Sequence, residues 1–564
     1  MKRFSLSIIL ATLSLLVSAQ STTPLLQNAL CSSPKREVRA VWLTTIGGLD
    51  WPKTYAHTAY TKEKQQEELR NLLDQYQRAG INTILLQTRV RGTMIYPSAH
   101  EPWDGCLSGV PGRSPGYDAL AFAIDECHRR GMELHAWVVT IPLGKWNGLG
   151  CKTMRRKLPA LVRRIGADGY MNPEKPQTAD YLATICEEIT RNYDIDGIHL
   201  DYIRYPENWP LRINRTEGRR NITRIVEAIH AKVKRLKPWV KMSCSPIGKY
   251  DDLPRYTSRG WNAYTKVCQD AQGWLKTGLM DQLYPMLYFK DNNFFPFAIN
   301  WKEESYGKMI VPGLGIYFMS PSERNWPIDV IKQELNVVRQ YGMGHAYFRG
   351  KFLTDNTKGI YDFAENDFTR YPALVPAMTW QHSTPPMPPT RLRLDSIKAT
   401  LSWSGAKDRS DAPYLVYNVY ASRQAPVDIH DARNIVAARI PSTSTRVPTA
   451  QGMAYAVTAM DRYGNESEPL QTHQKPIKTT HFPPATLLPC DGKRLQLPDK
   501  GQTLDALFVL IESLQGTMVT TRVYQGKYAD VSKLPEGMYV LRSINRKGYR
   551  HRLGHFMVKR NPNL

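Results

Sequence analysis

The sequence predicts an α/β fold, a (β/α)8 TIM barrel followed by one or two small all-β sandwich domains. The first observation behind this prediction is the regular alternation of short apolar runs with amphipathic helical patterns across residues 34–375. The second is a change to short strand patterns beyond a Pro-rich stretch, and the third is a strand that ends in polar residues, as strands do at the mouth of a barrel. A chain of 564 residues is too long for one core, so several domains are expected.

Eight apolar runs of strand length alternate with helical patterns. The predicted strands are Val38–Thr44, Thr83–Thr88, Glu133–Val139, Gly197–Tyr202, Lys241–Pro246, Gln282–Tyr288, Ile310–Ile316 and His345–Phe348. The predicted helices are Lys62–Ala79, Tyr117–Arg130, Thr178–Tyr193, Gly218–Leu236, Ala263–Thr277 and Ile328–Tyr341. Some of these helical patterns end at a glycine before the next strand, as at Gly80 and Gly131, which is a helix C-terminal signal. This count of strands and helices is that of a (β/α)8 barrel.

A doubly wound open sheet is the alternative fold. Such a sheet usually carries a Gly-rich phosphate-binding turn after its first strand. The segment Thr44-Thr-Ile-Gly-Gly-Leu49 lacks that spacing, so the barrel is favoured.

Beyond the barrel, residues 376–390 are rich in proline and are expected to form a stiff linker. Residues 391–478 combine short strands with an early Trp403 and a late Tyr455-x-Val457 pattern, as immunoglobulin-like sandwiches do, and resemble a fibronectin type III module. Residues 479–564 are expected to form a small C-terminal β domain. This domain is faintly similar to the sorting domains of some exported bacterial proteins, and a glycan-binding or spacer module is an equal alternative.

Residues 1–19 have the pattern of a secretory signal peptide. A basic start, Met1-Lys2-Arg3, precedes a short apolar run and the small residues Val17-Ser18-Ala19. The apolar run is too short to span a membrane, and no later run approaches the roughly 20 residues that a spanning helix needs. The protein is therefore expected to be exported, to the periplasm, the outer membrane or the medium. Its net charge of +24 favours an anionic partner, and export makes nucleic acid an unexpected one.

Eight cysteines in an exported chain could form disulfides. Cys106 and Cys151 lie in expected loops and form the predicted pair. The four cysteines on strand or helix patterns are expected to be buried apolar residues: Cys127, Cys186, Cys244 and Cys268. No C-x-x-C spacing of a zinc or redox site occurs.

The fourth predicted strand is the candidate catalytic element. Side chains alternate between the two faces of a strand, so His199 and Asp201 share one face while Ile198 and Leu200 share the other. Polar residues at the carboxyl end of a barrel strand point into the catalytic mouth. Asp201 is therefore the predicted catalytic carboxylate, and the nearby Arg204 is expected to favour its ionised form.

The other strand ends and first loop supply candidate substrate-binding residues. They are Asp50, Gln87, Arg89, His135, Trp137, His199, Arg204, Tyr284, Tyr288 and Arg349. Aromatic faces stack on sugar rings, and charged groups bind hydroxyls or acidic substituents, so this set favours a carbohydrate. For any one aromatic residue taken singly, core packing is the alternative role.

Glycoside cleavage usually needs a second carboxyl group. Glu101 and Asp196 are the further catalytic candidates, although Asp196 lies at the start of its strand and could instead cap or orient. Other acidic residues in the loops carry the same alternative of a capping role: Asp104, Asp251, Asp252 and Asp281. Metal chemistry is a competing possibility through His135, His199 and Asp201, but no metal-binding spacing supports it, and no cofactor is expected.

Six motifs in register resemble the bacterial glycosyl hydrolase-like 10 family. They are Glu37-Val-Arg-Ala-Val-Trp-Leu-Thr-Thr45 with Leu49-Asp-Trp-Pro52, Ala79-Gly-Ile-Asn-Thr83, Pro115-Gly-Tyr-Asp118, Arg130-Gly-Met-Glu-Leu-His-Ala-Trp137, Asp196-Gly-Ile-His-Leu-Asp201 and Ser245-Pro246. The resemblance implies a (β/α)8 barrel, an envelope location and glycosidase activity. A related exported enzyme acts on peptidoglycan glycan strands stripped of their stem peptides, so that polymer is the expected substrate.

The sequence thus predicts an exported, monomeric glycoside hydrolase that uses carboxylate acid/base chemistry on a cell-envelope polysaccharide. Two other functions remain open at this point. One is a catalytically inactive glycan-binding protein on the same barrel, and the other is a metal-dependent polysaccharide deacetylase or esterase.

Overall fold

The computed structural model describes residues 33–256, 259–472, 487–498, 506–513, 518–524, 527–545 and 550–559. The expected signal peptide at residues 1–19 lies outside the described residues. The chain divides into two compact units. One unit holds Lys35–Val338 and Met343–Lys475, and the other holds Met1–Pro34, Arg339–Gly342 and Pro476–Leu564. No helix in the described residues is both long and apolar enough to cross a lipid bilayer.

The first unit contains a closed barrel of parallel strands. In chain order the strands are β1 (Arg39–Leu43), β2 (Thr83–Arg89), β3 (Glu133–Val139), β7 (Gly197–Asp201), β8 (Lys241–Cys244), β9 and β10 (Gln282–Leu283, Met286–Leu287), β11 and β12 (Met309–Ile310, Gly313–Leu314) and β13 (His345–Tyr347). Strand β1 pairs with both β2 and β13, while β9 pairs with β11 and β10 with β12. The two interrupted strands therefore complete a ring of eight, which confirms the predicted barrel.

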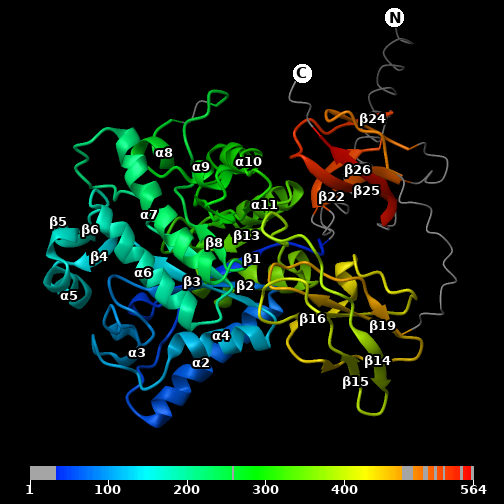
Figure 1. Ribbon diagram of the computed structural model, residues 1–564, viewed down its shortest axis with the longest axis horizontal. Coiled ribbons are helices and arrows are strands. Elements are labelled where there is room, and N and C mark those ends of the chain that lie inside the picture. The colour runs from blue at the N-terminus through cyan, green and yellow to red at the C-terminus, as the bar shows by residue number, and fades with distance from the viewer. Residues whose placement is uncertain are drawn as a thin grey trace, which may run out of the picture. The chain divides into compact units, whose positions relative to one another are not determined.

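Helices surround this ring (Figure 1). They are α2 (Ala59–Arg78), α3 (Gly105–Ser108), α4 (Ala119–Arg129), α6 (Pro176–Asn192), α7 (Arg215–Leu236), α8 (Ala263–Lys266), α9 (Ala271–Lys276), α10 (Phe295–Glu303), α11 (Ile328–Gln340), α12 (Gly350–Thr354) and α13 (Ile360–Phe363). Helices α6 and α7 lie side by side on the outside of the barrel. The helix expected over Ala263–Thr277 is split into α8 and α9 because Cys268 between them has a left-handed backbone, φ +57°.

An insertion follows β3 at the carboxyl end of the barrel. It consists of β4 (Pro142–Lys145), α5 (Leu149–Lys157), β5 (Val162–Ile165) and β6 (Asp168–Met171), with the three strands in the order β4–β6–β5. The predicted disulfide between Cys106 and Cys151 is wrong, because both thiols are free and buried. Each lies on a short helix, α3 or α5, rather than in an open loop.

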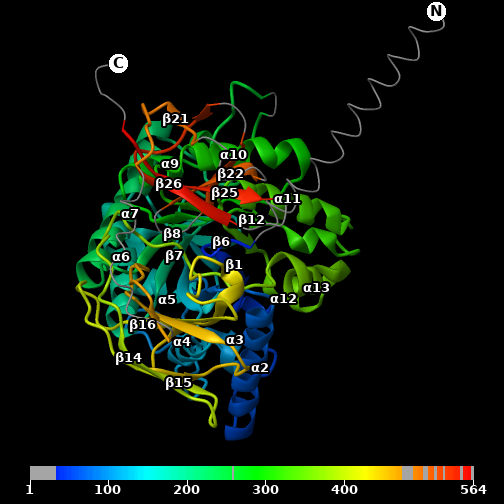
Figure 2. The ribbon, with the colours of Figure 1, turned by 90° about the vertical axis from the view of Figure 1, so that its right-hand side faces the viewer.

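A two-sheet antiparallel domain completes the first unit (Figure 2). One sheet holds β14 (Thr390–Asp395), β15 (Thr400–Ser404) and β18 (Ser444–Arg446); the other holds β16 (Val416–Ser422), β17 (Ile435–Ile440), β19 (Ala454–Met460) and β20 (Leu470–Gln471). Trp403 packs edge-on against Tyr417 at 5.4 Å between the sheets' apolar faces. The Tyr455 hydroxyl donates to the carbonyl of Pro448 at 2.7 Å, a contact that fixes strand corners in such sandwiches.

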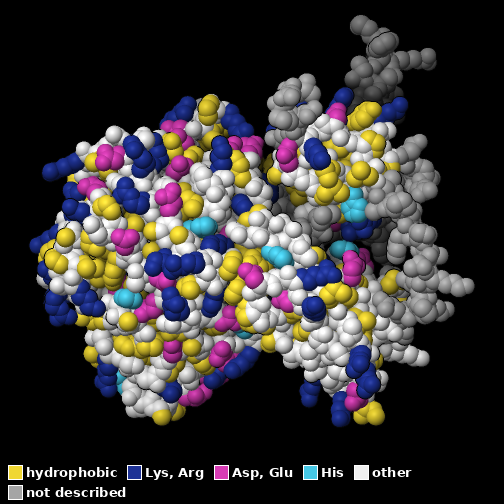
Figure 3. All heavy atoms as spheres, viewed as in Figure 1, with side chains coloured by type: hydrophobic (Ala, Val, Ile, Leu, Met, Phe, Trp, Pro, Cys, Tyr) yellow, Lys and Arg dark blue, Asp and Glu magenta, His cyan; other side chains and the backbone are white. Residues whose placement is uncertain are grey.

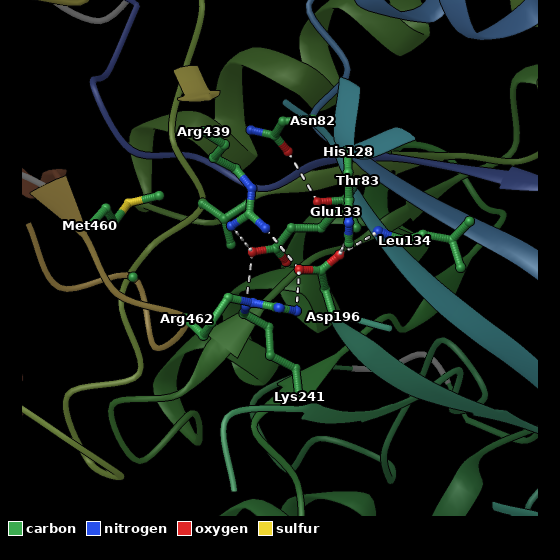
Figure 4. Close-up of polar contacts among 12 residues, drawn as sticks. Asn82, Thr83, His128, Glu133, Leu134, Asp196, Lys241, Arg439, Met460 and Arg462 are labelled. Carbon is green, nitrogen blue, oxygen red and sulfur yellow. Dashed lines mark hydrogen bonds and ion pairs between the residues drawn. The ribbon is translucent and has the colours of Figure 1, made fainter. Parts of the chain in front are cut away.

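Buried ion pairs join this sandwich to the amino end of the barrel (Figure 4). Arg439 donates to Glu133 at 3.1 Å and to Asp196 at 2.7 Å. Arg462 also donates to Asp196, at 3.2 Å, and the side chains of all four residues are at most 7% exposed. Paired charges of this kind are costly to break, because one partner is left buried without a counter-charge. The barrel and the sandwich therefore form one folded body.

A third buried carboxylate, Glu466, links the start of the barrel to the sandwich. It accepts hydrogen bonds from Lys35 at 2.6 Å, Arg36 at 3.2 Å and Thr458 at 2.7 Å, and another from the Tyr420 hydroxyl. Burial alone would raise the pKa of Glu466, but the charges of Lys35 and Arg36 outweigh it and lower the pKa to about 2. The carboxylate is therefore ionised at neutral pH.

The second unit contains the C-terminal β domain. Its strands are β21 (Arg494–Gln496), β22 (Ala506–Ser513), β23 (Met518–Val523), β24 (Tyr528–Asp530), β25 (Gly537–Asn545) and β26 (Arg550–Val558). The order β23–β22–β25–β26 forms an antiparallel sheet, and β21 pairs with β24. Leu495, Val509, Leu541 and Phe556 are among its fully buried residues. The predicted all-β character of this region is confirmed.

Candidate functional site

Asp201 ends β7 and points into the barrel at the carboxyl ends of the strands, as the strand periodicity predicts. Its Oδ1 accepts from the Ser245 hydroxyl at 2.7 Å and from the Tyr202 amide at 2.8 Å. Its Oδ2 accepts from Trp137 Nε1 at 3.1 Å. Strands β3 and β7 and the end of β8 therefore hold this carboxyl group in one orientation.

Burial raises the pKa of Asp201 above its ordinary value. The hydrogen bond from Ser245 and the charge of Arg204 lower it, as expected for groups that favour the anion, but they do not outweigh burial. The prediction that Arg204 holds Asp201 ionised is therefore not supported. The charge of Arg204 lowers the pKa of Asp201 by less than burial raises it. A carboxyl group with a raised pKa is suited to donate a proton.

The chain leaves β7 through a strained turn. Tyr202 has φ +52°, in the left-handed region that a bulky aromatic residue rarely adopts. The Arg204 guanidinium lies over the Tyr202 ring, 4.3 Å from its centroid, and pairs with Glu207 at 2.7 Å. The Glu207 side chain is 48% exposed, so it is an accessible carboxylate close to Asp201 in the sequence. Sequence reasoning missed it, although an acidic residue three positions after Arg204 was a usable signal.

Aromatic residues from the last strands form the other side of the site. Tyr288 stacks on Phe348 at 5.2 Å, and Tyr317 packs edge-on against both rings at 5.8 Å. All three residues are partly exposed. Burial and then the charge of Asp201 raise the pKa of Tyr288 well above its ordinary value, which places this ring close to the carboxyl group. Partly exposed rings beside an acid form a surface suited to a sugar ring.

Several predicted substrate-binding residues instead fill the interior of the barrel. The His199 ring accepts from Trp42 Nε1 at 3.2 Å and contacts Ser243 Oγ at 3.0 Å, and burial lowers the pKa of His199 well below its ordinary value. Tyr284 packs edge-on against His199. His135 contacts Glu133 at 3.1 Å, nearer the amino end of the strands. His135, His199 and Tyr284 are fully buried, so the prediction that they bind substrate is not supported.

Glu101 is not accessible either. Arg89 binds both of its carboxylate oxygens at 2.7–3.1 Å, and the Tyr181 hydroxyl donates to Oε1 at 3.0 Å. The side chains of Arg89 and Glu101 have no exposed surface, so neither can touch a polysaccharide in this arrangement. The pair instead anchors the loop after β2, and the expected roles of Glu101 in catalysis and Arg89 in binding are not supported.

Asp50, Gln87 and Arg349 organise the loop after β1. Asp50 accepts from Arg349 at 2.6 Å and from the Lys351 amide at 2.9 Å. Gln87 Oε1 accepts from the amides of Thr45 and Ile46, at 3.1 and 2.9 Å. These contacts hold the loop after β1 against β2 and the start of α12, and the side chain of Arg349 is 16% exposed.

The remaining acidic candidates have structural partners. Asp196 lies at the amino end of β7, in the ion pairs with the sandwich, and His128 also contacts it at 2.8 Å. It is therefore at the opposite end of the strand from Asp201, and a catalytic role is not supported. The loop carboxylates mostly accept from nearby amides, as at Asp104, Asp251 and Asp252, while Asp281 pairs with Lys234. In the described part of the chain, no three His, Cys, Asp or Glu side chains cluster so that they could hold a metal ion.

A closed (β/α)8 barrel with an inward acid and partly exposed aromatic rings at the carboxyl ends of its strands is the arrangement expected of a barrel glycosidase. The family model described as glycosyl hydrolase-like 10 matches residues 37–320. The chain belongs to this family. The predicted enzyme class, a glycoside hydrolase, is thereby confirmed.

Two curated relatives carry the same class name. Glycosyl hydrolase YngK of Bacillus subtilis is 30% identical over 508 residues, which cover 83% of this chain and 97% of that protein. Glycosyl hydrolase DigH of Escherichia coli is 29% identical over 328 residues, covering 50% of this chain and 74% of that protein. Among solved structures, α-L-fucosidase isoenzyme 2 from Paenibacillus thiaminolyticus matches with a TM-score of 0.40 and 14% identity, over 59% of this chain and 49% of that one.

Proposed function

We propose that this glycoside hydrolase cleaves the glycan strands of peptidoglycan outside the cytoplasm. The observation that carries the proposed chemistry is Asp201, a buried inward carboxyl group with a raised pKa, beside partly exposed aromatic rings. The basic chain, with a net charge of +24, suits an anionic envelope polymer. The family resemblance supports the choice of polymer.

In the proposed mechanism Asp201 is the proton donor. It gives its proton to the glycosidic oxygen as the bond from that oxygen to the anomeric carbon breaks. Glu207 is the proposed second carboxylate, because it is accessible and lies on the loop that leaves Asp201. It either receives the proton of the attacking water or adds to the anomeric carbon before water releases the sugar. Arg204 positions Glu207 through their ion pair.

The experiment measures reducing ends released from peptide-free peptidoglycan strands. Wild type is expected to release them, and Asp201→Asn and Glu207→Gln are each expected to lose at least about 100-fold in rate, since each removes one of the two carboxyl groups that the mechanism needs. Asp291→Asn is the control, because Asp291 is an exposed acid that follows β10 and is 66% exposed. It should keep full activity. Equal rates in wild type and Asp201→Asn would refute the mechanism.

The wild type and the Asp201→Asn variant also test the two alternative functions, an inactive glycan-binding protein and a metal-dependent esterase. Binding of strands by wild type and Asp201→Asn without any release of sugar would identify an inactive glycan-binding protein. Loss of activity in the presence of a chelator would instead favour the metal-dependent esterase. Full activity in the presence of a chelator would exclude that function.

Export and the accessory domains complete the proposal. The pattern of residues 1–19 supports export, to be tested by cell fractionation. The Trp403 and Tyr455 contacts support a fibronectin type III-like module over residues 391–478, after a linker at 376–390. The domain over residues 479–564 is proposed as a sorting or glycan-binding module, and the protein as a monomer. Deletion of residues 479–564 would change localisation in the first case and strand binding in the second.

A further inference from the structure

The insertion after β3 carries an unusual concentration of positive charge. Between residues 142 and 171 it has seven lysine and arginine residues against a single acid, Asp168. Lysine and arginine side chains gather at the left edge of the space-filling view (Figure 3), where Figure 1 labels α5 and β5. A basic surface of this kind attracts an anionic ligand.

Two of these arginines are held together on one tryptophan. The Arg155 and Arg164 guanidiniums lie 4.0 and 5.2 Å from the centroid of the Trp146 ring. Neither forms an ion pair with any described acidic residue; their hydrogen bonds go to the carbonyls of Trp146 and Gly166. Two like charges kept close without a counter-charge favour an added anion, and the ring offsets only part of their repulsion.

Arg91 connects this pair to the catalytic carboxyl group. It is exposed and follows β2, and its side chain packs against β4, where a Cβ added at Gly144 would lie 2.9 Å from Arg91 Cδ. On its other side Arg91 is near enough to Tyr202 to affect the ionisation of that ring. Arg91 forms no ion pair with a described residue. Unpaired positive charge therefore extends from the residue beside Asp201 to Trp146.

The insertion is also attached to the loop that follows β7. Arg163 lies over the Trp209 ring at 4.7 Å, and Tyr170 packs edge-on against the same ring at 6.4 Å. Trp209 follows Glu207 by two residues. The basic surface and the candidate catalytic loop are therefore parts of one packed structure.

We infer that Arg91, Arg155 and Arg164 form a subsite that binds a carboxylate group carried by the glycan in the barrel mouth. The inference rests on the proposed function and assigns recognition of one group of its substrate to these three residues. A glycan strand bears a free carboxylate on alternate sugars once its peptides are removed, whereas an attached peptide turns that carboxylate into an uncharged amide. A ligand with free carboxylates and its amidated counterpart therefore distinguish recognition by these arginines from other binding.

Calorimetry on the Asp201→Asn background tests this subsite without hydrolysis. The two probes are a tetrasaccharide of alternating N-acetylglucosamine and N-acetylmuramic acid with free carboxylates, and the same molecule with each carboxylate converted to a methylamide. We expect the free acid to bind about tenfold more tightly, and the added Arg155→Gln/Arg164→Gln changes to remove that preference while leaving the affinity for the methylamide unchanged. Arg391→Gln/Arg393→Gln on β14 is the charge-matched control and should keep the preference.

The possible outcomes distinguish failure of the carboxylate subsite from failure of the proposed function. Equal binding of the two probes before the arginine changes would overturn the inference and leave the proposed function intact. Failure to bind either probe would overturn both. Loss of the preference in the β14 control as well would show a general charge effect and overturn the subsite.

Discussion

Replacing Glu466 by glutamine tests the electrostatic attachment of the sandwich to the barrel. The pKa of this carboxyl group falls from 4.5 to about 2 on folding, and one pKa unit is worth 1.36 kcal/mol. The ionised form therefore contributes about 3 kcal/mol at pH 7, since the side chain is only 7% exposed. Glutamine resembles the protonated acid, so Glu466→Gln is expected to lower the free energy of unfolding by about that amount.

The destabilisation caused by Glu466→Gln should also depend on pH. A carboxyl group whose pKa is lowered by folding stabilises the protein above its unfolded pKa and loses that effect as the pH falls towards its folded pKa. The cost of Glu466→Gln should therefore shrink to about 1 kcal/mol at pH 3. Urea unfolding followed by circular dichroism at pH 7 and pH 3 measures both values, with the exposed neighbour Glu468→Gln as the matched control. A cost below about 1 kcal/mol at pH 7, or an equal cost at both pH values, would show that the charge of Glu466 does not stabilise this contact.

Three further predictions follow from the site and the domain contacts. Ser245→Ala removes a hydrogen bond that stabilises the Asp201 anion, so the alkaline limb of the pH profile of kcat/KM should move to higher pH; a shift to lower pH would contradict the proton-donor role. Gly131→Ala places a Cβ 2.3 Å from the Ala438 carbonyl at a residue with φ +72°, and a loss of about 1–3 kcal/mol is expected in urea unfolding, whereas an unchanged midpoint would show that this contact gives way. Arg439→Met removes a positive charge that pairs with the buried carboxylates of Glu133 and Asp196, so it should lower the free energy of unfolding by about 3 kcal/mol in the same assay. An unchanged free energy of unfolding would contradict a stabilising role for these ion pairs.

The architecture of the barrel and the inward direction of Asp201 could both be predicted from local sequence patterns. Apolar runs of strand length separated by helical patterns are a local signal, and the eight strands lie close to the predicted ranges. The alternation of side chains along Gly197–Asp201 depends only on the period of a strand, so the inward position of Asp201 could be derived without coordinates. The glycine C-terminal signals at Gly80 and Gly131 are equally local, and both residues have positive φ.

Which of the inward polar residues can reach a ligand depends on contacts between distant parts of the chain, which no local pattern shows. The period of a strand gives the face of a side chain but not its depth in the barrel, so His199 and Asp201 looked alike in the sequence although one is sealed in the interior. The role of Asp196 depends on Arg439, which lies 243 residues further along the chain and contacts it only after the sandwich has packed against the barrel. Burial also set the sign of the Asp201 pKa shift, because desolvation depends on the whole surrounding structure and outweighs the single nearby cation that a sequence can show.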